Sequence, residues 1–182
     1  SGECSPHSTK LSATVPFDMP SALLNNLTVR AFNAAYWRLE QRHRGKIVEH
    51  YSKFFYPLDA IGNWNRLYGR RGFYQFQCVV PLAGAEHVIS ELLRQIVRAR
   101  EGSFLAVLKT LGPIPSVGYL SFPREGVTLA LDFPNRGEST LALFERLDEI
   151  VIEAGGRLYP AKDGRMSKRM FCAGYENLQL FL

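Results

Sequence analysis

The chain has 182 residues, of which 46% are hydrophobic, enough for one sizeable core, so one domain preceded by an arm is expected. Twenty-two Lys and Arg against seventeen Asp and Glu give a mild, scattered net charge of +5. The sequence holds no run of about eighteen apolar residues, which argues against a membrane-spanning helix. Its first residues, SGECSPHSTK, lack the apolar stretch of a signal peptide.

The three cysteines, Cys4, Cys78 and Cys172, form no CxxC pair, and an odd number does not indicate a disulfide framework. This usage fits a reducing compartment, so we expect a cytoplasmic protein, with contact at the periphery of a membrane left open. Short basic clusters such as Arg42-His43-Arg44 and Lys168-Arg169 indicate either a solvated surface or attraction to an anionic partner.

The first 72 residues divide into an arm, a helix and a connection. Residues 1–20 are polar and rich in Ser and Pro, which predicts a flexible arm. Within 21–72, residues 28–42 follow a helical pattern with Thr28 placed to cap it. The apolar residues at helical spacing are Phe32, Ala35, Tyr36 and Leu39. Glycines, prolines and aromatic residues punctuate 43–72, which predicts an irregular, aromatic-rich connection.

Residues 73–182 are expected to fold as one unit. Alternation with period two predicts strands, and apolar residues three and four apart predict helices. In chain order these are strand 73–80, helix 84–100, strand 103–111, strand 126–133, helix 138–154 and strand 157–163, with a last helix within 167–181. Pro160 cannot donate a ladder hydrogen bond, so the fourth strand is expected at an edge. The order βαββαβ predicts an α+β, ferredoxin-like fold, an antiparallel sheet with both helices on one face.

Strand alternation also sorts the side chains between the two faces of this sheet. The purely apolar sets should contact the helices. The other face then collects Gln75, Gln77, Lys109 and Thr128 among apolar neighbours. A few polar groups on an apolar surface are typical of a ligand wall, and equally of a half-exposed face with solvated side chains.

The residue types and their spacing argue against several kinds of functional site. His7, His43, His50 and His87 are scattered, and no pair has ligand spacing with a carboxylate, so no metal site is expected. No glycine-rich turn is predicted to open a helix after a strand, so a nucleotide site built wholly within this chain is not expected. The sequence has no GxSxG elbow, and Cys78 has no basic neighbour in the predicted strand to activate its thiol.

Lys162 is open to a chemical interpretation. It ends the segment RLYPAK (157–162), directly after the predicted edge strand. A lysine placed where negative charge develops can stabilise an anion. The alternative is a surface lysine paired with Asp163.

Four separated segments resemble, in the same order, one flavoprotein family. They are FFYPLDAIGNWNRLYGRRGFYQFQCVVP (54–81), FLAVLKTLGP (104–113), LSFPREGVTLALDFP (120–134) and AGGRLYPAKDGRMS (154–167). The chain is similar, from about residue 20 onward, to the aldonolactone oxidase branch of the vanillyl-alcohol-oxidase family, whose members oxidise sugars with FAD. The resemblance implies that this chain is the substrate domain, which lays an antiparallel sheet over the flavin. It further implies that FAD is bound mainly by a domain absent from this chain, and that the chain alone is inactive.

The resemblance also implies roles for particular residues. The family's Gln-x-Gln pair in the substrate pocket falls on Gln75 and Gln77, and its pocket lysine falls on Lys109. Its lysine close to the flavin pyrimidine edge falls on Lys162, with Tyr159 beside it. A lysine there favours the reduced, anionic flavin and thus hydride acceptance.

The pocket aromatic of the family is matched by Phe55, with Tyr56 next to it, and both are expected to contact substrate. This chain also departs from the family pattern. Thr128 and Ala130 stand where the third strand of the family alternates an asparagine and a cysteine, and Leu111 replaces a phenylalanine. These changes lie in the pocket and leave the identity of the sugar open.

The resemblance implies two partners, a sugar or sugar-phosphate substrate and the FAD-binding domain of the same protein. A homodimer is expected because the isolated chain would expose its flavin-facing surface. The alternative is a stand-alone ligand- or RNA-binding module, since βαββαβ folds host both. RNA-recognition sheets stack bases on exposed aromatics, whereas Tyr74, Phe76 and Phe104 should point toward the helices, so no nucleic acid partner is expected.

Overall fold

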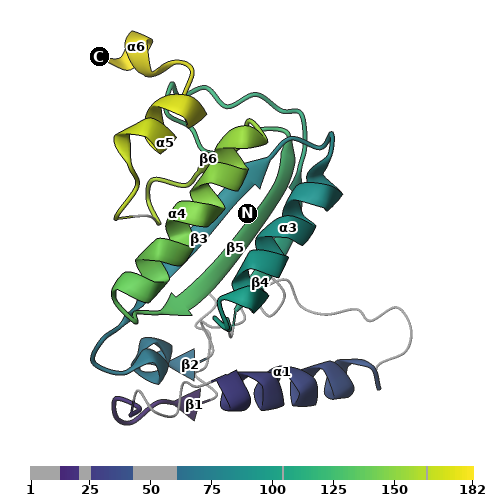
Figure 1. Ribbon diagram of the computed structural model, residues 1–182, viewed down its shortest axis with the longest axis vertical. Coiled ribbons are helices and arrows are strands. Elements are labelled where there is room, and N and C mark those ends of the chain that lie inside the picture. Colours follow the sequence, from purple (N-terminus) through teal and green to yellow (C-terminus); the bar gives the residue numbers. More distant parts are fainter. Residues whose placement is uncertain (1–12, 21–25, 43–60, 104, 163) are drawn as a thin grey trace, which may run out of the picture.

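The computed structural model describes residues 13–20, 26–42, 61–103, 105–162 and 164–182 of the chain. Its main body is a four-stranded sheet crossed on one face by two helices that lie side by side, α3 and α4 (Figure 1). In chain order the body consists of β3 (Phe73–Val80), α3 (Ala85–Arg98), β4 (Ala106–Leu111), β5 (Gly126–Pro134), α4 (Glu138–Glu153) and β6 (Arg157–Leu158).

The strands lie in the order β4-β5-β3-β6, and every neighbouring pair is antiparallel. The α+β class and the element order βαββαβ are therefore confirmed. The two longest strands, β3 and β5, form the centre of the sheet, and the short strands lie at its edges. The finer assignment to the ferredoxin-like fold stays a prediction.

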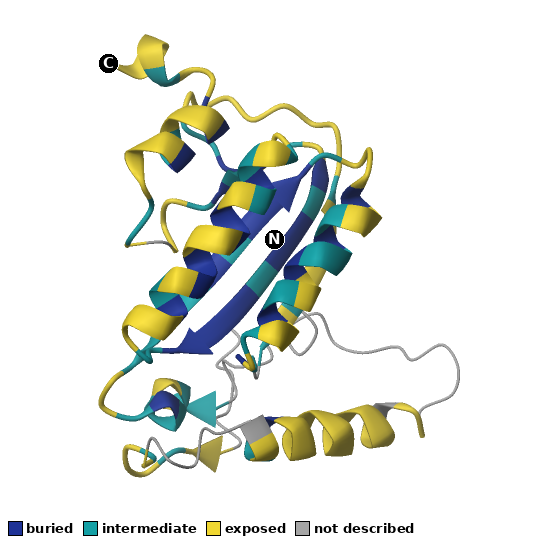
Figure 2. Ribbon diagram, viewed as in Figure 1, coloured by how far each residue is buried: buried dark blue, intermediate teal, exposed yellow. Residues whose placement is uncertain are grey.

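The core lies between the sheet and the two helices, where the apolar sets of the strands meet the apolar stripes of α3 and α4 (Figure 2). Burial of such side chains is the main favourable term in folding, at about 25 cal/mol per Å² of apolar surface. The core residues that come from the strands are Phe76, Cys78, Val80, Leu129, Leu131, Phe133 and Leu158. The alternation predicted for the strands is thus confirmed on the helix side.

Helix α3 buries a narrower stripe than its sequence indicated. Ile89, Leu92 and Ile96 are buried, whereas Leu93 is 43% and Val97 is 74% exposed. Only the side chains that face the sheet directly can be covered by it, so two of the apolar positions of this helix lie at its flank.

The fourth strand is shorter than expected, because β6 pairs with β3 only through Arg157 and Leu158. Tyr159 still donates its backbone N–H to the carbonyl of Gln77 at 2.9 Å. Pro160 has no N–H to continue the ladder. The chain then turns, with Lys162 N donating to Tyr159 O at 3.0 Å. The expected edge position is confirmed, and Lys162 lies on a turn rather than on a strand.

The N-terminal elements lie at one end of the body. β1 (Ala13–Thr14) pairs in parallel with β2 (Ile61–Gly62), and the 3-10 helix η2 (Trp64–Tyr68) follows. Helix α1 (Asn26–Glu40) begins two residues before the expected cap at Thr28. Its predicted apolar face does not join the core, since Phe32 and Leu39 remain 51% and 54% exposed.

The last predicted helix is interrupted. Residues 167–181 form α5 (Lys168–Gly174) and α6 (Leu178–Phe181) instead of one helix. Ser167 caps α5 by accepting a hydrogen bond from Met170 N at 3.1 Å. The break follows from the burial of Tyr175, whose hydroxyl donates to the carbonyl of Leu158 at 2.6 Å and ties the segment to β6.

Candidate functional site

Four of the polar residues singled out in the sequence share the sheet face opposite α3 and α4. Gln75 lies directly opposite Asp132, and Lys109 lies directly opposite Thr128. Directly opposed residues project to the same side of a sheet, and alternate residues along a strand do too. Gln75, Gln77, Lys109 and Thr128 therefore lie on one face, as predicted, which we call the polar face.

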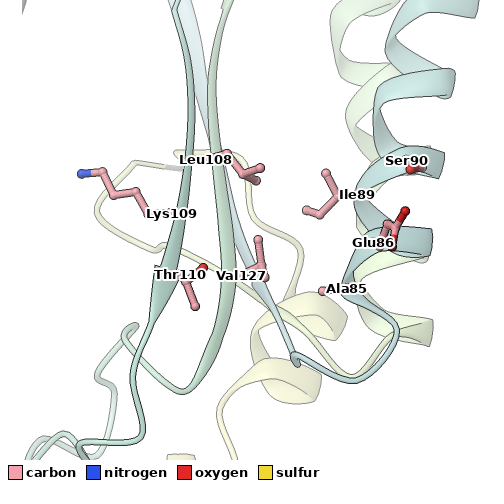
Figure 3. A pocket seen from close by; sticks show the side chains of 8 residues that line it. All are labelled: Ala85, Glu86, Ile89, Ser90, Leu108, Lys109, Thr110 and Val127. Carbon is pink, nitrogen blue, oxygen red and sulfur yellow. The ribbon is translucent and has the colours of Figure 1, made fainter. Parts of the chain in front are cut away.

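Figure 3 shows this separation at β4. Leu108 points toward Ile89 of α3, whereas the side chain of Lys109 extends in the opposite direction. Lys109 is exposed, Gln75 and Gln77 are half-buried, and Thr128 is only 4% exposed. Solvent therefore reaches the side chains of Lys109, Gln75 and Gln77 on the polar face, whereas Thr128 is covered.

Both glutamines are held by residues of β5. Gln75 Nε2 donates to Asp132 Oδ1 at 3.0 Å, and Gln77 Nε2 lies 3.4 Å from Thr128 Oγ1. These cross-strand bonds reduce the number of rotamers that each amide can adopt. The two amides are thus fixed in place on the face before any ligand binds.

Asp132 also lies on the polar face, directly opposite Gln75, and was not named as a site residue from the sequence. Its side chain is 2% exposed, and its Oδ2 has no hydrogen-bond partner among the described residues. Burial raises the pKa of the Asp132 carboxyl, while the hydrogen bond from Gln75 and the charge of Lys162 act in the opposite direction. The signal in the sequence for this buried carboxylate, which lacks a full set of hydrogen bonds, is an aspartate within an otherwise apolar strand.

Lys162 reaches the polar face electrostatically from the turn after β6. Its ammonium group is exposed and close enough to Asp132 to lower the pKa of that carboxyl. Tyr159, three residues earlier, accepts the backbone hydrogen bond of Lys162; it is half-buried and stacks on Phe122 with ring centroids 4.6 Å apart. The turn that contains Lys162 therefore lies close enough to Asp132 for the two charges to interact. The alternative partner Asp163 lies outside the described residues.

The two aromatic residues expected to contact substrate, Phe55 and Tyr56, also lie outside the described residues. Nearby on the described chain, Tyr68 of η2 is 3% exposed and stacks on Phe73 at 4.5 Å. Burial, and to a lesser extent the negative charge of Asp132, raise the pKa of the Tyr68 phenol well above its usual range.

A cavity of about 400 Å³ lies on the other side of the sheet, between α3 and β4 (Figure 3). Its lining includes Glu86, Ser90 and Thr110. Lys109 also borders it, but its ammonium group points away from α3. This cavity contains none of the other site residues expected from the sequence and is distinct from the polar face.

Two other chemistries gain no support from the described part of the chain. Burial raises the pKa of the Cys78 thiol to about 12, so this cysteine carries no thiolate at neutral pH. In the same part of the chain, no group of three or more His, Cys, Asp and Glu side chains could hold a metal ion.

No helix described here is long and apolar enough to cross a membrane.

The aromatic residues of β3 do not lie where an RNA-binding sheet would need them. Tyr74 and Phe76 contact Phe144 of α4, with ring centroids 5.8 and 5.5 Å apart. Phe73 lies on the polar face, where it packs against Tyr68. The expectation that Tyr74 and Phe76 point toward the helices is therefore confirmed, whereas Phe104 lies outside the described residues.

No family model matches the chain, and two of the known proteins to which it is similar show its relationships. The chain is 38% identical over 165 residues to decaprenylphosphoryl-beta-D-ribose oxidase of Mycolicibacterium smegmatis, covering 91% of this chain and 35% of that enzyme. It is 36% identical over 124 residues to a protein of Streptomyces coelicolor described as an uncharacterized protein in the mprA 5' region, covering 68% of this chain and 33% of that protein. The chain thus spans about a third of the length of each of these two relatives. Over most of its length it is therefore related to a part of decaprenylphosphoryl-beta-D-ribose oxidase, which confirms the resemblance to this branch of FAD-dependent oxidases.

Proposed function

We propose that this chain is the substrate-covering part of an FAD-dependent oxidoreductase that oxidises a hydroxyl carbon of a sugar. The observation that carries the proposal is the polar face, where two oriented amides and the amine of Lys109 lie on one side of the sheet. Lys162 approaches the same group from a neighbouring turn. The similarity to an oxidase whose name specifies a ribose supports an oxidoreductase and a sugar-type substrate.

The residues of this chain fit one edge of a flavin rather than the whole cofactor. Lys162 supplies an exposed ammonium group, and Tyr159 supplies a ring at the base of the same turn. The sequence offers no glycine-rich loop that would hold the phosphates of FAD. We therefore assign most of the FAD contacts to a part of the protein beyond this chain.

When bound, FAD would supply the chemistry by accepting a hydride from the sugar carbon. Lys162 would place positive charge where negative charge gathers during that transfer, and an electrostatic group of this kind acts most strongly where water is excluded. Gln75 and Gln77 would hold sugar hydroxyl groups, and Lys109 would attract an anionic substituent such as a phosphate. Phe55, Tyr56 and Thr128 would complete the wall.

The test is anaerobic reduction of the flavin by sugars in the complete protein that carries this chain. We expect Lys162→Ala to slow flavin reduction by on the order of 10²-fold, the scale of removing one preorganised electrostatic group. Lys168→Ala is the matched control, because Lys168 is an exposed lysine at the start of α5 and should leave the rate unchanged. An undiminished rate in Lys162→Ala would remove the assigned role.

A further inference from the structure

A glutamine amide has a donor end and an acceptor end, and the end that faces a ligand decides what it can recognise. The Nε2 group of Gln75 donates to Asp132 Oδ1 at 3.0 Å. An ionised carboxylate only accepts hydrogen bonds. The amide of Gln75 therefore has one favourable orientation, with its Oε1 turned away from Asp132.

Asp132 is itself firmly held. Its backbone N–H donates to Ser103 Oγ at 3.1 Å and lies 3.4 Å from the carbonyl of Leu105. Its side chain is 2% exposed, in the middle of the strand pair β3–β5 and opposite Gln75. A carboxylate fixed in this way can determine the orientation of the neighbouring amide at little entropic cost.

Gln77 repeats the arrangement more weakly. Its Nε2 lies 3.4 Å from Thr128 Oγ1, a hydroxyl that can accept a hydrogen bond. The ionised Asp132 carboxylate only accepts, so it determines which end of the Gln75 amide faces β5, whereas the Thr128 hydroxyl can accept or donate and leaves Gln77 either orientation. The amide oxygen of Gln75 is therefore the one directed away from β5.

We propose that Asp132 is a positioning residue that makes Gln75 present its carbonyl oxygen to the ligand, so that this point of the face selects a hydroxyl donor over an acceptor. A sugar ring hydroxyl satisfies the oxygen, whereas a carbonyl or fully esterified oxygen at the same position leaves it unpaired. The inference rests on the proposed function, since it takes the polar face as the substrate wall. It adds which atom of Gln75 does the recognition and which residue determines that choice.

Burial makes the ionised Asp132 carboxylate energetically unfavourable. A charge that lowers the stability of the fold is expected where binding, rather than stability, retains it. Its Oδ2 has no hydrogen-bond partner among the described residues. The charged or titratable groups that face it in the described structure are the ammonium of Lys162 and the phenol of Tyr68. Once protonated, the carboxyl becomes a donor as well as an acceptor, and the amide of Gln75 is no longer restricted to one orientation.

The orientation can be tested on the chain alone, without any enzyme assay. In a nitrogen-15-labelled sample, the side-chain amide signals of Gln75 are identified by their loss in Gln75→Leu. We expect these signals to move with pH at one midpoint that is raised above that of an ordinary aspartate, and to stay fixed in Asp132→Leu. Signals of Gln75 that do not respond to pH in the unmodified chain would contradict the proposal.

Recognition is tested by steady-state kinetics in the complete flavoprotein. Asp132→Leu removes the acceptor and frees the amide, so we expect KM for the sugar to rise about tenfold, or about 1.4 kcal/mol, with kcat within threefold. Asp132→Asn presents a donor as well as an acceptor, as the protonated carboxyl does, so its KM should match that of the unmodified protein below the Asp132 midpoint and should not depend on this titration. In the unmodified protein KM should rise as pH falls through the Asp132 midpoint, and Asp132→Leu should remove this dependence.

A double-mutant cycle separates positioning from a general structural effect. In a Gln75→Ala background, adding Asp132→Leu should raise KM by less than twofold, because the amide that it orients is already absent. Ile89→Val, in the core on the helix side of the sheet, serves as a control that lowers stability and leaves KM unchanged. Fully additive effects, or an unchanged KM in Asp132→Leu, would overturn the inference while leaving the oxidase function in place. An unmodified protein whose flavin no sugar reduces would reject both.

Discussion

At the scale of single residues, two aspartates are buried in the described part of the chain, and their hydrogen-bond partners differ. Asp148 is 5% exposed, and its two oxygens accept from both terminal nitrogens of Arg165, with Nη2 to Oδ1 at 3.0 Å. Asp132 is 2% exposed, and among the described residues only its Oδ1 accepts a hydrogen bond from a side chain, that of Gln75. A bidentate pair of this kind compensates for burial, whereas one amide compensates for it only in part.

The two aspartates should therefore respond differently to neutralisation. The pKa of Asp132 is raised in the folded chain, so its ionisation destabilises the fold increasingly as pH rises from its unfolded pKa through its folded pKa. Asp132→Asn should then be more stable at pH 7, on the order of 1 kcal/mol, and the gain should vanish in acid. Thermal unfolding at several pH values measures this difference.

Asp148→Asn is the matched comparison for that measurement. It removes one charge of a paired, buried set and breaks the bidentate contact with the Arg165 guanidinium. Breaking a buried pair is destabilising, by about 3 kcal/mol where burial is deep. A gain in stability for Asp148→Asn, or a loss for Asp132→Asn at neutral pH, would contradict this account of the two sites.

At the scale of elements, β5 depends on a glycine at its first residue. Gly126 has φ +154, and a Cβ there would lie 2.2 Å from the carbonyl oxygen of Val80. The absence of a side chain lets β5 approach the end of β3 closely where the two strands begin to pair.

Gly126→Ala should accordingly destabilise the chain by about 2–4 kcal/mol, since the backbone of one strand must move. Urea unfolding measures the change. Gly112→Ala, in the loop between β4 and β5, is the control, because a Cβ there meets no atom within 4 Å. Equal stability of the two variants would mean that the approach of β5 to Val80 is less constrained than the structure indicates.

The elements also show where sequence patterns are informative. β3 and α4 were predicted almost to the residue, because their periodicity is long and both bury one continuous face. α1 was predicted as a helix, but its apolar spacing could not reveal whether a neighbouring element covers those side chains, and Phe32 and Leu39 remain exposed. The fourth strand was predicted too long because its predicted range runs past Pro160, which has no N–H to continue the ladder and where the chain turns away from the sheet.

At the scale of the whole molecule, the chain spans about a third of the length of each of the two relatives described above. We predict that the chain alone binds FAD weakly or not at all, while the complete protein binds it tightly. Quenching of flavin fluorescence on titration measures both affinities. Tight binding by the chain alone would contradict the assignment of the FAD phosphates to another part of the protein. Self-association of the chain stays a prediction, which sedimentation at rising concentration tests.

The sequence by itself determined the class of the fold, the order of its elements and the face on which Gln75, Gln77 and Lys109 lie, because strand alternation is a local property with a period of two residues. It also carried the relationship to a flavin oxidase, through segments that match in order. Only the tertiary structure decided that Asp132 meets Gln75 and that Lys162 approaches them, since these contacts depend on strand register and on a turn. Register is determined by packing between residues more than fifty positions apart, which no local pattern encodes.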